Sequence, residues 1–205
     1  MPSFDRRHVL GLSAAAMGIA GLVSLYTRGP GQGGVRLLPK ADRRDFNLRD
    51  TSGKAVSLAA YQGKWLLLFF GYTHCPDVCP TTLVNIADTL KALGGRAATF
   101  QPIFITIDPE RDTPEMMSDY LANFGGGFIG LTGTPDQVAA AANAYGVFYR
   151  RQPAADGDDM MDHSTAIALV SPRGNFLRVF RPDDAPEAFA AELISYTHEA
   201  QEAGL

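Results

Sequence analysis

One continuous apolar run, Trp65–Phe70, constrains the fold of this chain more than any other feature. Gly63 and Gly71 bound the run, whose sequence WLLLFF shows no alternation between polar and apolar residues. A strand that is apolar on both faces is typical of a parallel sheet covered on both sides. The run therefore predicts a central strand in a sheet with helices packed on each face.

The segments around this run alternate between strand patterns and helix patterns. Thr113 and Thr134 each precede a proline, which is typical of a helix N-terminus, and Pro80 suits the first turn of another helix. The patterns predict strands over Phe46–Leu48, Ala55–Leu58, Trp65–Phe70, Pro102–Ile107, Phe128–Leu131, Ala166–Val170 and Phe176–Phe180, and helices over Thr81–Leu93, Thr113–Phe124, Pro135–Tyr145 and Pro186–Ala200. We therefore expect an α/β fold, in which a mixed central sheet is flanked by helices on both faces and the last two strands form a β-hairpin.

The N-terminus differs in composition from the rest of the chain. Arg6 and Arg7 precede an apolar run from Val9 to Tyr26, which is close to the ~20 residues that a membrane-spanning helix needs. No clear small-residue cleavage signal follows, which favours an uncleaved anchor over a cleaved signal peptide. The pattern Arg-Arg-x-Val-Leu fits either a twin-arginine export signal or an ordinary one. We expect a signal or membrane anchor over residues 1–28, a flexible linker over 29–40 and the folded domain over 41–205.

Composition excludes some classes of function. The 205 residues carry a net charge of −4, which argues against a nucleic-acid-binding protein. The chain is 46% hydrophobic and long enough to bury a core without cross-links. Its cysteines are therefore not needed as scaffolding in the way that a small secreted domain needs them.

The chain has two cysteines, Cys75 and Cys79, in the stretch FFGYTHCPDVCPTTL. They fall between the predicted strand Trp65–Phe70 and the following helix, where open α/β sheets bind ligands. A helix N-terminus stabilises thiolates, and a spacing of four places both sulfurs on one face of a helical segment. These residues alone leave open a buried structural pair, a redox couple or part of a metal site.

The stretch Gly71–Pro80, GYTHCPDVCP, resembles the signature of the SCO/SenC family. The resemblance continues at Asp108–Pro114, DPERDTP, and at Asp162–Ser164, and it extends from about Phe46 to the final helix. Members of this family are membrane-tethered, thioredoxin-like copper proteins that help to assemble the copper centre of cytochrome c oxidase. The resemblance implies a thioredoxin-like copper-binding domain over residues 41–205.

The resemblance also implies a set of metal ligands, namely Cys75, Cys79 and His163, with copper as Cu(I), Cu(II) or both. Two thiolates and an imidazole suit copper, whereas a structural zinc site usually takes four ligands. Met160 and Met161 are alternatives in this region, either as thioether ligands or, as we favour, as packing residues. His163 follows Gln152–Asp162, which lacks periodicity and is expected to be a polar loop.

Two polar features near the cysteines have both a structural and a functional interpretation. Asp77 is expected to accept hydrogen bonds from N–H groups of the cysteine turn. In the stretch 108–114, Asp112 and Thr113 fit a helix cap with Arg111 paired to Glu110 or Asp112. Alternatively, this stretch contacts a partner protein, or its residues influence the metal site through contacts with the ligands.

The function implied by the resemblance is a copper chaperone that delivers copper to cytochrome c oxidase. The expected partners are the copper-receiving subunit of that oxidase, other periplasmic copper chaperones and, through the N-terminal segment, a membrane. The expected location is the bacterial inner membrane with the domain in the periplasm, or else the periplasm as an exported soluble protein. No enzymatic activity is expected beyond a thiol–disulfide reductase side activity.

Two other functions compete with copper delivery. Cys75 and Cys79 are the redox pair of a thiol–disulfide oxidoreductase in one alternative, which would act on cysteines of a copper-protein precursor. Their C-x-x-x-C spacing departs from the C-x-x-C of thioredoxin-like redox proteins. A peroxidase is disfavoured because position 76, three residues before Cys79, holds proline where peroxiredoxins have threonine.

Overall fold

The computed structural model describes residues 42–153, 159–181 and 185–204. Its strands are β1 (Asn47–Asp50), β2 (Ala55–Ser57), β3 (Trp65–Gly71), β4 (Phe100–Thr106), β5 (Ile129–Thr132), β6 (Tyr149–Gln152), β7 (Met160–His163), β8 (Ile167–Val170) and β9 (Phe176–Phe180). Its α-helices are α2 (Val78–Ala92), α3 (Pro114–Ala122), α4 (Pro135–Tyr145) and α5 (Pro186–Glu202), and two 3₁₀ segments are η2 (Leu58–Tyr61) and η3 (Gly94–Thr99). The predicted anchor and linker lie outside these residues. Within them, no helix combines the length and the hydrophobicity needed to cross a membrane.

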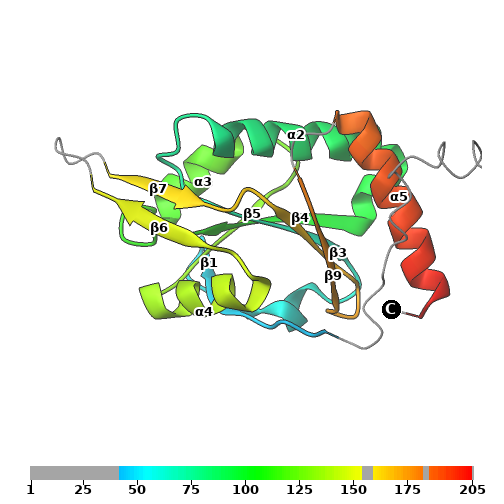
Figure 1. Ribbon diagram of the computed structural model, residues 1–205, viewed down its shortest axis with the longest axis horizontal. Helices are drawn as coiled ribbons and strands as arrows, with labels where there is room; N and C mark the ends of the chain where they lie inside the picture. The colour runs from blue at the N-terminus through cyan, green and yellow to red at the C-terminus, as the bar shows by residue number, and fades with distance from the viewer. Residues whose placement is uncertain (1–41, 154–158, 182–184, 205) are drawn as a thin grey trace, which may run out of the picture. The chain divides into compact units, whose positions relative to one another are not determined.

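A seven-stranded mixed sheet in the order β2-β1-β5-β4-β3-β8-β9 forms the centre of the domain. β3 runs parallel to β4 and antiparallel to β8, and β4 runs parallel to β5 (Figure 1). All seven residues of β3 are buried, because neighbouring strands lie on both edges and helices on both faces. The apolar run therefore forms a central strand as predicted.

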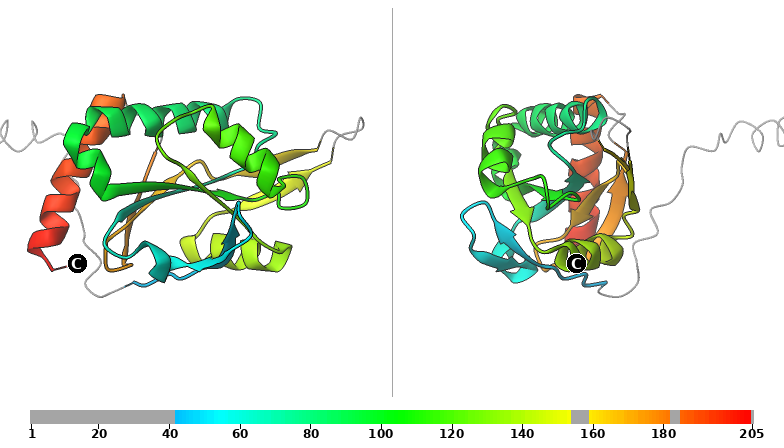
Figure 2. Two further views of the ribbon diagram at one scale, coloured as in Figure 1. Left: turned by 180° about the vertical axis from the view of Figure 1, so that it is seen from behind. Right: turned by 90° about the vertical axis from the view of Figure 1, so that its left-hand side faces the viewer.

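Helices cover both faces of this sheet, as the sequence predicted. Figures 1 and 2 show α2 and α3 on one side of the sheet and α4 on the other, with α5 packed beside α2. The predicted helix caps are present, since the Thr113 side chain accepts from Met116 N and Thr134 forms a capping box with Gln137. The β8–β9 hairpin is also confirmed.

A second hairpin, β6–β7, was not predicted. It forms a separate two-stranded sheet, in which Tyr149 pairs with His163 and Gln152 with Met160. The interpretation of Gln152–Asp162 as a loop without secondary structure is therefore wrong for its two ends, while 154–158 lie outside the described residues. The missed strands have four residues each and are mostly polar, so main-chain hydrogen bonds form them without an apolar pattern.

Candidate metal centre

Three side chains from two separate parts of the chain converge beyond the end of β3. Cys75 lies in the turn after β3, Cys79 in the first turn of α2 and His163 at the end of β7. Their ligand atoms all lie within 4.8 Å of one another. Because metal–sulfur and metal–nitrogen bonds of about 2.0–2.3 Å keep ligands within roughly 4.6 Å of each other, small side-chain movements would close the three around one ion.

The helix α2 begins at Val78, three residues earlier than predicted. Pro80 therefore falls in the first turn, where its missing N–H removes no helical hydrogen bond. Cys79 is thus helical and fully buried, whereas Cys75 precedes the helix and is half-buried. The Cys79 N–H donates to Cys75 Sγ at 3.4 Å. This hydrogen bond holds the two cysteines close to each other although Cys75 lies outside the helix.

Gly71 makes room for the buried sulfur. A Cβ at this position would lie 2.8 Å from Cys79 Sγ and 2.9 Å from the Phe104 ring, which is closer than side-chain atoms approach in packed interiors. The glycine that ends the apolar run is therefore required for space at the cysteine, and not for an unusual backbone angle.

His163 faces the cysteines with its Nε2 atom, which lies 3.4 Å from Cys79 Sγ. Its Nδ1 atom lies 3.0 Å from the carbonyl oxygen of Ser164. Because a carbonyl only accepts hydrogen bonds, Nδ1 carries the proton and Nε2 offers its lone pair toward the sulfurs. The rings of Phe69 and Tyr72 pack around the imidazole. This orientation is the one that a metal-ligating histidine needs.

The two thiols have opposite proton affinities. Hydrogen bonds to the Cys75 sulfur, above all from the Cys79 thiol and also from main-chain N–H groups, lower the pKa of Cys75 to about 3. The Cys79 thiol donates to that thiolate and is buried, so the pKa of Cys79 is raised. Between these limits the pair holds one proton, and the half-buried Cys75 carries the negative charge.

This asymmetry predicts a pH profile for thiol modification. Cys75 of the reduced, metal-free protein should react with iodoacetamide at a rate that stays nearly flat from pH 5 to 8, because its pKa lies below this range. A free cysteine with an ordinary pKa should instead slow by about tenfold for each unit of pH lowered. Cys79 should remain unmodified. Peptide mass spectrometry after timed quenching measures both rates, and a Cys75 rate that rises tenfold per pH unit would contradict the predicted thiolate.

Other candidates named from the sequence occupy different positions. Met161 is buried, as expected for a packing residue, whereas Met160 is partly exposed. The Asp77 side chain makes no cap hydrogen bond to α2, so its predicted role in the turn is wrong in that respect. A further histidine, His74, adjoins Cys75 in the sequence but points to Asp112, with Nδ1 3.7 Å from the carboxylate, and it is not among the converging ligands.

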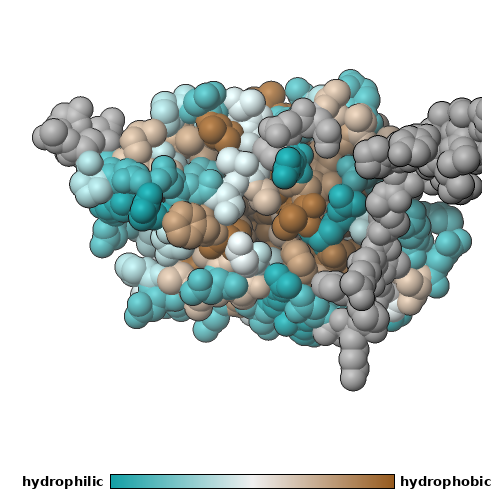
Figure 3. Space-filling view, viewed as in Figure 1, coloured by the Kyte–Doolittle hydropathy of each residue, from teal (hydrophilic) through white to brown (hydrophobic). Residues whose placement is uncertain are grey.

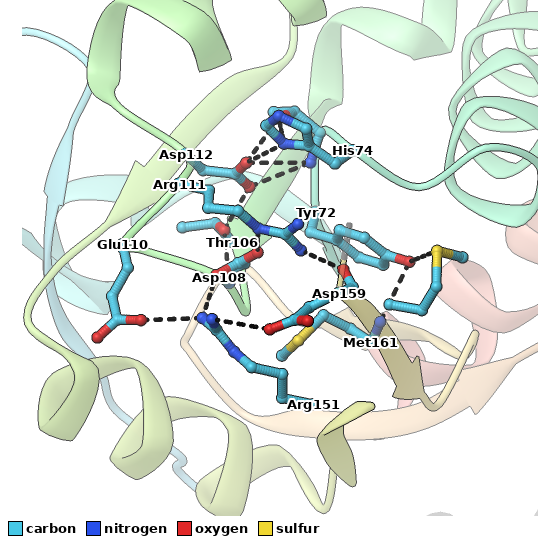
Figure 4. Close-up of polar contacts among 12 residues, drawn as sticks. Tyr72, His74, Thr106, Asp108, Glu110, Arg111, Asp112, Arg151, Asp159 and Met161 are labelled. Atoms are coloured by element: carbon cyan, nitrogen blue, oxygen red, sulfur yellow. Dashed lines mark hydrogen bonds and ion pairs between the residues drawn. The ribbon is translucent and has the colours of Figure 1, made fainter. Parts of the chain in front are cut away.

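The stretch 108–114 lies beside the site, but its ion pairs differ from the prediction. Arg111 pairs with Asp108, and not with Glu110 or Asp112 (Figure 4). Thr113 caps α3 as expected, while Asp112 accepts hydrogen bonds from Thr73 and Thr106. These contacts arise because the ends of β3 and β4 adjoin, which brings the two loops together.

Two further residues near the site were missed by sequence reasoning. The Tyr72 hydroxyl accepts a hydrogen bond from Met161 N and donates to Met160 Sδ, so it connects the end of β3 with β7. Arg151, on β6, contacts the buried Asp108. Tyr72 stands within the GYTHC signature, which was a usable signal, but nothing in the sequence around Arg151 indicated its contact.

Comparison with known proteins agrees with this geometry. The family model described as SCO1/SenC matches residues 37–198. The chain belongs to the SCO1/SenC family. Its α/β fold is thioredoxin-like, as the resemblance implied, and the solved structures of the family share it.

Among SCO1/SenC relatives, the human mitochondrial protein SCO2 homolog is 43% identical over 135 residues, which cover 64% of this chain and 51% of that protein. The chain thus spans about half the length of the first curated relatives that it matches. A SCO2-like protein of Rickettsia felis is 35% identical over 181 residues, 87% of this chain and 83% of that protein. The copper-bound structure of Bradyrhizobium japonicum ScoI is 44% identical, with a TM-score of 0.69, and the match covers 75% of this chain and 98% of that one.

Proposed function

We propose that this protein is a copper chaperone that holds copper between Cys75, Cys79 and His163 and delivers it to the copper centre of cytochrome c oxidase during assembly. The observation that carries the proposal is the convergence of these three donors within 4.8 Å on the scaffold of a SCO1/SenC protein. Thiolates select Cu(I), and the imidazole suits Cu(II). The fit of the donors to copper is supported by solved relatives described as copper-bound from Bradyrhizobium japonicum and yeast.

The proposed setting is the bacterial inner membrane, with residues 1–28 as anchor, 29–40 as linker and 41–205 as the copper-binding domain in the periplasm. The apolar run after Arg6 and Arg7 supports the anchor. A tether would raise the effective concentration of the domain near a membrane-bound recipient, without any new contact. The proposed recipient is the copper-receiving subunit of the oxidase, and other periplasmic copper chaperones are the proposed source of the ion.

Copper binding that depends on the thiol state tests this function. The purified full chain should bind one Cu(I) when both cysteines are reduced and lose nearly all of that binding after they are oxidised to a disulfide, because thiolates are the strong ligands. Competition with a coloured Cu(I) chelator, together with a thiol count on the same sample, gives the stoichiometry. Equal copper uptake by the oxidised and reduced proteins would show that the thiolates of Cys75 and Cys79 do not bind the ion.

A thiol–disulfide oxidoreductase remains the second candidate, and one observation favours it. A stabilised Cys75 thiolate beside a protonated Cys79 is the arrangement that attacks a disulfide and then resolves the mixed intermediate. Catalysed reduction of insulin disulfides distinguishes the two functions. We expect slow reduction, because the Cys79 thiol is buried and can approach a mixed disulfide at Cys75 only from the interior of the domain.

A further inference from the structure

The two parts of the metal centre are joined by one loop, residues 107–113, which we call the bridging loop. The cysteine turn follows β3, and His163 ends a hairpin that begins more than sixty residues later in the sequence. The bridging loop follows β4, which is the parallel neighbour of β3. It contacts the cysteine turn through Asp112 and the hairpin through Asp108, so both sides of the centre depend on the same short segment (Figure 4).

On the cysteine side, the contact is a buried carboxylate. The Asp112 side chain is fully buried and accepts from Thr73 N at 3.1 Å, from Thr73 Oγ1 at 2.6 Å and from Thr106 Oγ1 at 2.6 Å. Thr73 stands two residues before Cys75. Several donors to one buried carboxylate form a rigid connection, because breaking it would leave polar groups without partners away from water.

On the histidine side, the contact is a second buried carboxylate shared by two arginines. Asp108 is fully buried and pairs with Arg111 of its own loop and with Arg151 of β6, whose Nη2 atom lies 3.0 Å from Asp108 Oδ1. The Arg151 guanidinium also contacts Glu110 at 2.9 Å and Asp159 at 3.6 Å. Charge-assisted hydrogen bonds of this kind are stronger and more directional than neutral ones.

The position of the β6–β7 hairpin depends on side-chain contacts of this kind. β6 and β7 pair with each other and do not join the seven-stranded sheet among the described residues. Hydrophilic side chains cover most of the hairpin on the face seen in Figure 3, and Met161 is the one residue of β6 and β7 that is buried. The contacts that fix its place beside the cysteines include the Tyr72–Met161 hydrogen bond and the Arg151 ion pairs.

We infer that Arg151 and Asp108 form a latch that positions His163 relative to Cys75 and Cys79, which makes Arg151 a positioning residue for the metal centre. The latch acts through β6, where Arg151 pairs with Met161 in β7, two residues before His163. A closed latch holds the imidazole against the sulfurs, and an open latch frees the hairpin while Asp112 keeps the cysteine turn in place. The consequence for copper rests on the proposed function, but the latch itself is a property of the metal-free protein.

Arg150 provides a matched control. It is the neighbouring residue of the same strand, but its ion pair with Asp162 at 3.2 Å is exposed, with 63% and 54% of the two side chains accessible. Exposed pairs of this kind contribute little. Arg151→Met removes the latch and still leaves Asp108 paired with Arg111, so the variant is expected to fold. Arg151→Lys keeps the charge but lacks the planar fork.

The first measurement is hydrogen exchange in the reduced, metal-free full chain. Arg151→Met should raise the exchange rate of amides in β6 and β7 by about tenfold, as expected for a lost charge-assisted hydrogen bond, with Arg151→Lys intermediate and Arg150→Met unchanged. Exchange in β3 and β4 should not change. Unchanged hairpin exchange in Arg151→Met, or an equal increase throughout the domain, would overturn the latch.

The second measurement follows the histidine in the loaded protein. Arg151→Met should shorten the lifetime of bound Cu(II) and alter its electron paramagnetic resonance spectrum, while Cu(I) held by the two thiolates changes less. A Cu(II) spectrum and lifetime equal to those of Arg150→Met would mean that the hairpin does not position His163. Should the parent protein bind no copper, the proposed function fails, and the exchange experiment still decides the latch.

Discussion

Replacing either Cys75 or Cys79 with serine is expected to abolish the ability of this protein to restore oxidase assembly in a strain that lacks it. A hydroxyl is a poor ligand for Cu(I), and the remaining thiolate and imidazole cannot replace the lost sulfur. Oxidase activity should fall to the level of the deletion strain in both variants. Added copper should restore it in part, because excess ion bypasses the delivery step. Membrane oxidase activity with and without copper in the medium measures the effect.

A suitable control for these variants is Thr81→Ser. Thr81 is exposed on α2, two residues after Cys79, and its hydroxyl donates to Asp77 O, which a serine can also do. This variant should complement fully. Full complementation by Cys75→Ser or Cys79→Ser would show that oxidase assembly requires neither copper delivery through these sulfurs nor a redox cycle of the Cys75–Cys79 pair. Strong catalysed disulfide reduction by the parent, together with full oxidase activity in the deletion strain, would instead favour the oxidoreductase.

Removing the imidazole with His163→Ala is expected to weaken Cu(II) binding by more than about 100-fold, since even residues that only orient a ligand contribute 10–100-fold. Cu(I) binding should weaken much less, because two thiolates can hold Cu(I) in the absence of the imidazole. Titration of both oxidation states against competing chelators measures the two affinities.

His74→Ala is the matched control for this loss, because His74 adjoins Cys75 but faces Asp112. It should leave both affinities close to those of the parent. If His163→Ala binds both ions as the parent does, His163 is only a hairpin residue. A large fall in the melting temperature of metal-free His163→Ala would instead assign it a structural role.

The central part of the fold was predictable because its residues carry strong local signals. Trp65–Phe70 is apolar on both faces, and Thr113 and Thr134 combine a cap with a following proline. Such patterns depend on neighbours in the sequence and on burial, which the sequence displays directly. The β6–β7 hairpin depends instead on main-chain pairing between short polar segments, which leaves no apolar pattern.

For the candidate site, sequence resemblance indicated which residues to consider as ligands but not how they are arranged. Cys75, Cys79 and His163 were identified through motif resemblance, whereas the contrast between a buried and a half-buried thiol follows from where α2 begins. Arg111 pairs with Asp108 three residues earlier in the same loop, whereas the pairing of Arg151 with that carboxylate depends on the tertiary approach of β6 to the end of β4. No spacing along the chain encodes such a contact.

If the protein transfers copper as proposed, the unequal burial of the two cysteines sets the order in which the metal–sulfur bonds are exchanged. An incoming donor atom can approach the half-buried Cys75, whereas Cys79 is enclosed by the first turn of α2, Gly71 and Phe104. In the proposed transfer, ligand exchange would therefore begin at Cys75 and the bond to Cys79 would break last. In that proposal, the enclosed sulfur would hold the ion until the recipient has supplied replacement ligands, which would keep the ion from escaping into solution.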